Sequence, residues 1–216
     1  MLKRVFDIVF SIVVLLVFFP LAIIIMIILL LTGEHEVFYL QGRVGKGGRI
    51  FKMIKFATMV KNSPNIGTGD ITVKNDPRVL PIGNLLRLTK LNEMPQFVNV
   101  LIGNMSVVGP RPLTRKNYDY YTDEQKQIID QLKPGVSGVG SIIFRDEEEI
   151  LAKSEKPYIE CYRTEIAPYK AALEEWYLNH KSLWTDIKVI FLTVWVIFFK
   201  KSRLPYNILT DLPKRS

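Results

Sequence analysis

The residues best suited to phosphate chemistry gather around a short segment in which Asn92 and Glu93 precede a proline. Pro95 removes a backbone donor and disfavours helix at the residue before it. The polar pair therefore lies near the end of an element, where side chains are freer to face a ligand. Further on, Arg111 stands between two prolines. Stiff flanking residues suit a guanidinium that grips a phosphate through two hydrogen bonds, although a surface loop with an idle arginine explains this tripeptide equally well.

The composition indicates an anionic partner. The chain has 216 residues and a net charge of +8, which fits binding to phosphates, nucleic acid or an acidic membrane surface. Cys161 is the single cysteine, so we expect no disulfide within the chain and no cysteine-based zinc site. A nucleic-acid binder is the least favoured class, because neither a recognition helix nor a platform of aromatic and basic residues is recognisable.

The N-terminal part contains a membrane segment. Residues 8–31 carry no charge, and the stretch exceeds the roughly 20 apolar residues that span a bilayer. Pro20 follows Phe19 in its middle, where a proline kinks a helix. Basic residues flank both ends, and the positive-inside rule places both flanks on the cytoplasmic side. We therefore expect a re-entrant helix that breaks at these two residues and returns, with a kinked span and a cytoplasmic globular part as the alternative.

The remaining pattern predicts an α+β fold that is rich in helix. Val37–Leu40 and Arg49–Met59 are expected to form a β-hairpin around a glycine-rich turn, and Lys55 on its second strand is a candidate phosphate ligand. Thr122 begins a capping box that opens a helix. Near the C-terminus, Val189–Phe199 is apolar with a basic rim and too short to span. We expect an amphipathic helix in the membrane interface, with a buried core helix as the alternative.

Several segments together resemble the bacterial sugar transferase family, the monotopic polyprenyl-phosphate phosphoglycosyl transferases. The resemblance covers nearly the whole chain, and the combination of segments is specific although no single one is. The segments are KRVFDIVFSIVVLLVFFPL, GRVGKGGRIFKMIKFATM, NDPRVLPIGNLLRLTKLNEMPQFVNVLIGNMSVVGPRP, KPGVSGVGSIIFR and WYLNHKSLWTDIKVIFLTV.

The resemblance implies a reaction and its participants. A sugar 1-phosphate would move from a UDP-sugar to polyprenyl (undecaprenyl) phosphate, which initiates a surface glycan such as exopolysaccharide, capsule, O-antigen or a glycoprotein glycan. Mg²⁺ on the diphosphate would neutralise charge on the leaving phosphate. Glu93 is the expected metal ligand, and the phosphates would meet four basic candidates: Lys55, Arg87, Arg111 and Arg145.

The resemblance also implies a location and three regions. Residues 1–33 would form the re-entrant membrane helix, residues 34–183 the cytoplasmic phosphoglycosyl transferase domain, and residues 184–216 the interfacial helix and tail. The catalytic domain would lie on the cytoplasmic face of the bacterial inner membrane. Expected partners are membrane phospholipid and downstream glycosyltransferases beside the two substrates, and no nucleic acid is expected.

The segment around the polar pair departs from the family pattern. The family has Asp-Glu before x-Pro-Gln, and its aspartate attacks phosphorus to form a phosphosugar-enzyme intermediate; here the pair is Asn92-Glu93. Asn104 and Ala57 likewise replace a carboxylate and an arginine. Because a neutral amide is not a nucleophile, three routes stay open. Glu93 attacks or binds Mg²⁺, the lipid phosphate attacks directly while Asn92 positions, or the protein binds without turnover as a scaffold. We favour an enzyme, with Glu93 and Asn92 as the catalytic candidates.

Overall fold

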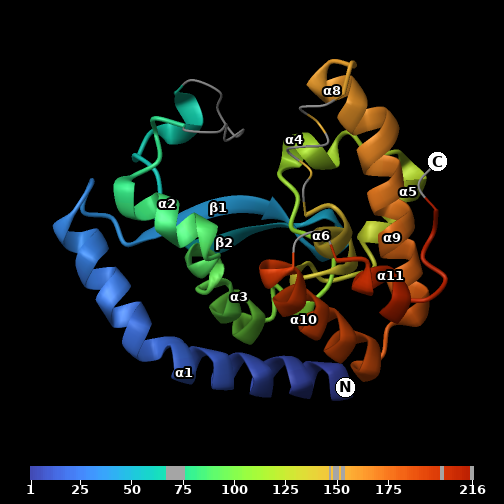
Figure 1. The fold of residues 1–216 in the computed structure, drawn as a ribbon, viewed down its shortest axis with the longest axis horizontal. Helices are drawn as coiled ribbons and strands as arrows, with labels where there is room; N and C mark the ends of the chain where they lie inside the picture. Colours follow the sequence, from blue (N-terminus) through green and yellow to red (C-terminus); the bar gives the residue numbers. More distant parts are fainter. Residues whose placement is uncertain (67–75, 146, 148–150, 152–153, 200–201, 215–216) are drawn as a thin grey trace.

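The computed structural model describes residues 1–66, 76–145, 147, 151, 154–199 and 202–214. Within them the chain forms a helix-rich domain with two small sheets, beneath which a long N-terminal helix runs (Figure 1). One sheet is an antiparallel hairpin and the other a parallel pair of short strands. The expected α+β class with a small β-hairpin is confirmed.

The elements are, in chain order, α1 (Leu2–Leu31), β1 (Phe38–Val44), η1 (Lys46–Gly48), β2 (Ile50–Phe56), η2 (Ser63–Asn65), α2 (Pro81–Leu88), η3 (Leu91–Glu93), α3 (Gln96–Ile102), β3 (Ser106–Val108), α4 (Arg115–Tyr118), α5 (Asp123–Ile129), β4 (Gly135–Ser137), α6 (Val139–Ile143), α8 (Tyr158–Cys161), η4 (Tyr162–Ile166), α9 (Ala167–His180), α10 (Leu183–Phe198) and α11 (Leu204–Ile208).

The long helix α1 is continuous through Phe19 and Pro20, so the expected break takes the form of a bend within one helix, visible near its middle in Figure 1. A proline inside a helix produces such a bend. Most of its apolar side chains are exposed. By length and composition it is the one helix in the described part of the chain that could cross a membrane. Its last turns bury Ile25 and Leu29 in a small core shared with β2 and α2.

The predicted hairpin is confirmed, and its first strand runs further than expected, to Val44. β1 and β2 pair with Tyr39 opposite Lys55 and Arg43 opposite Phe51. Directly opposite residues of an antiparallel pair project on the same side, and successive residues alternate. Arg43 and Lys55 therefore share one face of the hairpin.

The C-terminal helices close the main core. α10 buries Val189 and Leu192 against it, while Trp184, Phe191 and Phe198 are exposed on the other side. The expected helix over this apolar run is thus present, with one face covered and one open. The predicted capping box is confirmed as well, since it begins α5 with both of its reciprocal hydrogen bonds.

One buried carboxyl group in this core makes folding sensitive to pH. Glu174 of α9 is 5% exposed, and its Oε2 has no hydrogen-bond partner within the described residues. Burial raises its pKa to about 8, against the opposing effects of Lys170 and the Gly140 amide. The folded protein therefore keeps a proton on Glu174 up to about pH 8, whereas the unfolded chain releases it near pH 4.5. The free energy of unfolding falls as pH rises through this window, by at most about 1.4 kcal/mol per pH unit.

We expect Glu174→Gln to remove this dependence. Relative to the parent protein, the variant should gain about 2 kcal/mol between pH 6 and pH 8, measured as the pH dependence of denaturant or thermal unfolding in detergent. Glu175→Gln changes the neighbouring exposed carboxylate and should leave the dependence in place. An unchanged pH profile in Glu174→Gln would contradict the assignment.

Candidate active site

Glu93 lies between two cations that come from distant parts of the chain. Its Oε1 is 3.9 Å from Lys55 Nζ and 3.6 Å from a guanidinium nitrogen of Arg111. Glu93 ends the short helix η3, Lys55 belongs to β2, and Arg111 follows β3. The side chains of Glu93 and Lys55 are each 16% exposed, whereas that of Arg111 is half exposed. The first two are therefore largely removed from water, whereas Arg111 is accessible to it.

The surrounding cations keep Glu93 ionised. Burial alone would raise the pKa of Glu93, but Arg111, Lys55, Lys90 and Arg43 together lower it to about 2. At neutral pH this carboxylate therefore carries its full negative charge and offers two oxygen atoms to a metal ion or an electrophile.

The same surroundings destabilise the charge on Lys55. Burial lowers the pKa of Lys55 to about 7; Glu93 opposes this shift, and Arg43, Arg111 and Arg87 add to it. Positive charges outnumber the single carboxylate, so the site carries excess positive charge. A ligand with two or more negative charges, such as a diphosphate, would relieve this repulsion.

The backbone that carries Arg111 is fixed on both sides. The carbonyl of the proline before it accepts a hydrogen bond from the Gly135 amide at 2.8 Å, and that of the proline after it accepts from Arg43 at 3.0 Å. At Gly109 the chain passes so close to its neighbour that a Cβ atom would lie 2.2 Å from the Lys133 carbonyl oxygen. The stiff arginine loop inferred from the flanking prolines is held by these contacts.

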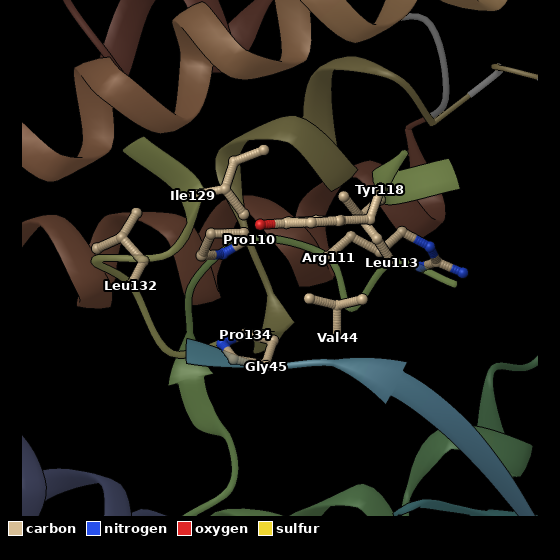
Figure 2. A pocket seen from close by; sticks show the side chains of 9 residues that line it. All are labelled: Val44, Gly45, Pro110, Arg111, Leu113, Tyr118, Ile129, Leu132 and Pro134. Atoms are coloured by element: carbon tan, nitrogen blue, oxygen red, sulfur yellow. The ribbon is translucent and has the colours of Figure 1, made fainter. Parts of the chain in front are cut away.

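Two hollows meet at Arg111. One is lined by Lys55, Glu93 and Arg111 and is polar. The other lies behind the loop and is mostly apolar, with the ring of Tyr118 on one side and Val44 on the other (Figure 2). Arg111 thus separates a hollow lined by charged side chains from a mostly apolar hollow.

Asn92 lies beside Glu93 in η3 but is buried. It is 7% exposed, does not line the hollow of Glu93, and its Oδ1 has no hydrogen-bond partner in the described chain. A neutral amide is much less costly to bury than a carboxylate, so this buried position accommodates an asparagine better than an aspartate. A buried acceptor without a partner is uncommon, and it leaves Asn92 able to accept a further hydrogen bond.

The residues of the site fit a Mg²⁺ ion that arrives with its substrate. Proteins commonly hold Mg²⁺ through one or two carboxylates, while phosphate oxygens and waters complete the shell. Glu93 provides one such carboxylate. No group of three or more His, Cys, Asp or Glu side chains in the described residues is placed to hold a metal ion by itself. The donor set therefore suits a metal carried by a diphosphate better than a permanently bound ion.

The structure brings together most of the candidates inferred from sequence. Glu93, Lys55 and Arg111 surround one hollow, and the charge of Arg87 acts on Lys55. Arg145 is not part of this group: it does not line the hollow, and its guanidinium lies 3.4 Å from the carbonyl oxygen of residue 197 at the end of α10. The short helix α6 that precedes it packs against α10, which directs this arginine to that helix.

Two polar side chains that line the hollow were not among the sequence candidates, those of Arg43 and Gln96. Arg43 was missed because the expected first strand ended at Leu40 and left Arg43 in the turn; the observed strand runs to Val44, and its two-residue alternation places Arg43 on the face of Lys55. The sequence places Gln96 directly after Pro95 but does not indicate a role for it. Its burial at the start of α3 depends on tertiary packing.

The chain belongs to the bacterial sugar transferase family, whose model matches residues 1–200. The resemblance inferred from the motifs is thereby confirmed. The UDP-glucose:undecaprenyl-phosphate glucose-1-phosphate transferase of Escherichia coli (strain K12) is 36% identical over 205 residues, covering 94% of this chain and 41% of that protein. The undecaprenyl-phosphate galactose phosphotransferase of Salmonella typhimurium is 32% identical over 210 residues, covering 91% and 40%.

A shorter relative matches over most of its length. The exopolysaccharide production protein ExoY of Rhizobium meliloti is 30% identical over 208 residues, which are 90% of this chain and 84% of that protein. The chain thus spans about two fifths of the first two relatives and most of the third.

Proposed function

We propose that this protein is a phosphoglycosyl transferase that moves a sugar 1-phosphate from a UDP-sugar to undecaprenyl phosphate and so initiates assembly of a surface glycan. The observation that carries the proposal is an ionised Glu93 held against Lys55 and Arg111 in a site with excess positive charge. Two relatives of the same family are named for transfer to this lipid. A catalytically impaired scaffold is less well supported, because a protein that only binds does not require an ionised carboxylate among the phosphate-binding cations.

The donor would bind with its diphosphate between the cations of the site. Lys55, Arg43 and Arg111 hold its phosphate oxygens. Glu93 would hold a Mg²⁺ ion, which would supply neutralisation of the charge that develops on the departing nucleotide.

Glu93 then acts as the nucleophile in this proposal. One carboxylate oxygen forms a bond to the sugar-bearing phosphorus, and the bond from that phosphorus to the bridging oxygen breaks, so UMP leaves with the electron pair. The lipid phosphate next attacks the same phosphorus and releases Glu93 as a carboxylate. Asn92, buried beside it, positions this side chain.

Nucleotide release and protein mass test the proposal. Purified protein with Mg²⁺ and undecaprenyl phosphate should release UMP from at least one UDP-sugar, and no release across a broad panel of donors would overturn the function. Without the lipid, the intact protein should gain the mass of one phosphosugar, mapped to Glu93. Turnover without that adduct would instead assign the attack to the lipid phosphate.

The pH dependence of donor capture should follow Lys55. Because its pKa is about 7, the free protein loses this positive charge as pH rises through 7. kcat/KM for the UDP-sugar, which reports free-enzyme ionisations, should fall by up to about tenfold per pH unit above that point. Lys55→Arg keeps its charge and should flatten the profile between pH 7 and 9, whereas Lys52→Arg, which alters a lysine on the other face of the hairpin, should not. A falling limb that persists in Lys55→Arg would refute the assignment.

We further propose that α1 is re-entrant, that α10 lies in the interface, and that the domain sits on the cytoplasmic face of the inner membrane. A straight helix of 30 residues is about 45 Å long. Yet both ends of α1 contact the same globular part, through Lys3 and Asp7 at its start and Leu29 at its end. This arrangement supports a helix that enters one leaflet and returns. The exposed aromatic side of α10, with Trp184 and Phe198, supports its interfacial place.

Cysteine labelling in oriented vesicles tests the topology. Leu2→Cys and Glu34→Cys, introduced separately, should both react with a membrane-impermeant reagent only from the cytoplasmic side. The native cysteine is buried and should contribute little background. Labelling of the two positions from opposite sides would establish a span.

A further inference from the structure

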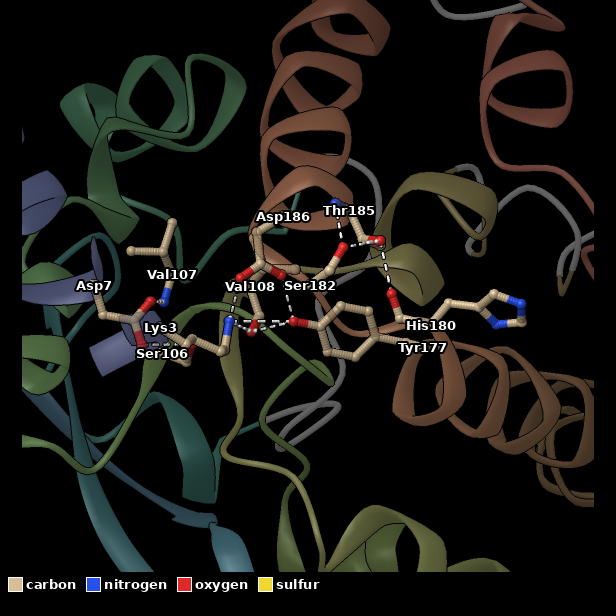
Figure 3. Close-up of polar contacts among 10 residues, drawn as sticks. All are labelled: Lys3, Asp7, Ser106, Val107, Val108, Tyr177, His180, Ser182, Thr185 and Asp186. Carbon is tan, nitrogen blue, oxygen red and sulfur yellow. Dashed lines mark hydrogen bonds and ion pairs between the residues drawn. The ribbon is translucent and has the colours of Figure 1, made fainter. Parts of the chain in front are cut away.

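The start of α1 is bound to the strand that leads to Arg111. Lys3 Nζ lies 2.5 Å from Asp186 Oδ2 and 3.3 Å from the carbonyl oxygen of Val108, the last residue of β3. The Tyr177 hydroxyl accepts from Lys3 at 3.2 Å and donates to Asp186 Oδ1 at 2.5 Å (Figure 3). The Asp186 side chain is fully buried. One lysine of α1 therefore joins β3, α9 and α10.

One turn later, Asp7 binds the same strand from its other end. It is 3% exposed, and its carboxylate accepts hydrogen bonds from the Ser106 hydroxyl at 2.9 Å and the Val107 amide at 3.1 Å. All three residues of β3 are thus contacted by the first two turns of α1. The arginine loop follows β3 directly.

Between these two residues, Arg4 binds the helix that follows Glu93. Its guanidinium donates to the carbonyl oxygens of Val100 at 2.5 Å and Leu101 at 2.7 Å, near the C-terminus of α3. Carbonyls at that end lack partners within the helix, and a cation there is favoured by the helix dipole. α3 begins three residues after Glu93, so Arg4 restrains the segment that carries the carboxylate.

We propose that Lys3, Arg4 and Asp7 are positioning residues of the active site, which hold β3 and α3 so that Arg111 stays at contact distance from Glu93. Lipid contacts alone would suffice for a membrane anchor, whereas an ion pair with the fully buried carboxylate of Asp186 costs desolvation and is sensitive to the loss of its partner. The membrane helix is therefore also part of the scaffold of the site. The inference has a structural arm, that these residues hold β3 and α3 in place, and a catalytic arm, that this placement supports the reaction. The catalytic arm rests on the proposed function; the structural arm does not.

Hydrogen exchange tests the structural arm on the full-length protein in detergent. Asp7→Asn weakens the contact with β3. The double change Lys3→Met with Asp186→Asn removes both charges, so that no unpaired charge is left in the core. Each should raise amide exchange across residues 106–113 by about tenfold or more, while the hairpin of residues 38–56 stays protected. Val9→Ala, an exposed position one half-turn from Asp7, should change neither segment. Unchanged exchange in 106–113, or an equal rise in both segments, would overturn the inference.

A double-mutant cycle tests the catalytic arm. If Lys3 acts through Arg111, then Arg111→Ala should lower kcat/KM at least tenfold less in the background of Lys3→Met with Asp186→Asn than in the parent protein. Lys3→Arg should restore most of the coupling. Additive losses would show that Lys3 merely keeps the protein folded, and would overturn the positioning role. A parent protein that releases no UMP would count against the proposed function alone, because the exchange measurement still decides the inference.

Discussion

Replacing Glu93 with glutamine is expected to lower the rate of UMP release by at least about 10³-fold, since loss of a nucleophile removes a reaction path and not only a contact. The change keeps the size of the side chain and removes its charge, so the fold should persist. No phosphosugar adduct should form. Asn92→Ala should lower the rate of UMP release less, by about 10-fold to 100-fold, because a residue that only orients the reacting group does not itself form a bond to the substrate.

Two comparisons make this result specific. Glu160→Gln alters an exposed carboxylate away from the hollow and should leave the rate unchanged. Retention of more than about a tenth of the activity in Glu93→Gln would mean that the lipid phosphate attacks directly, in which case the intact-mass experiment should show no adduct in the parent protein either.

Replacing Arg111 with alanine is expected to lower kcat/KM by about 10²-fold to 10³-fold, the size of effect that follows deletion of one preorganised hydrogen-bond donor to charge that develops in a transition state. Arg111→Lys should recover only part of this loss, because an ammonium group cannot reproduce the two parallel hydrogen bonds of a guanidinium. Arg115→Ala is the matched control. That arginine is 65% exposed and pairs with Asp119, the residue that follows α4.

The arginine replacement should also leave a signature in the pH profile. Arg111 is one of the charges that lower the pKa of Lys55. Removing it should move the decline of kcat/KM to higher pH, in addition to the loss in magnitude. A loss of activity with the decline still centred near pH 7 would show that Arg111 does not act on Lys55, and would contradict the arrangement of the site.

The sequence was informative where chemistry follows local pattern. Alternation and glycine placement predicted the hairpin, and prolines predicted the fixed Arg111 loop. The placement of Arg145 away from the hollow of Glu93 could not be read from its neighbours in sequence, because they do not reveal that α6 packs on α10. The contact between Lys3 and Asp186 joins residues 183 positions apart, and no periodicity encodes such a pairing. The sequence shows that asparagine stands where the family pattern has aspartate, but the burial of Asn92 is set by tertiary packing and could not be predicted.

The contact of both ends of α1 with one globular body has a consequence for the lipids that this protein tolerates. A spanning helix must match its apolar length to the hydrocarbon thickness, and a mismatch costs energy through tilt or membrane deformation. A re-entrant helix has both ends at the same membrane surface, so it does not have to cross the hydrocarbon core. On the proposed topology, lengthening or shortening the acyl chains of the host bilayer leaves the separation of its two ends unchanged, so the same chain suits membranes of different thickness.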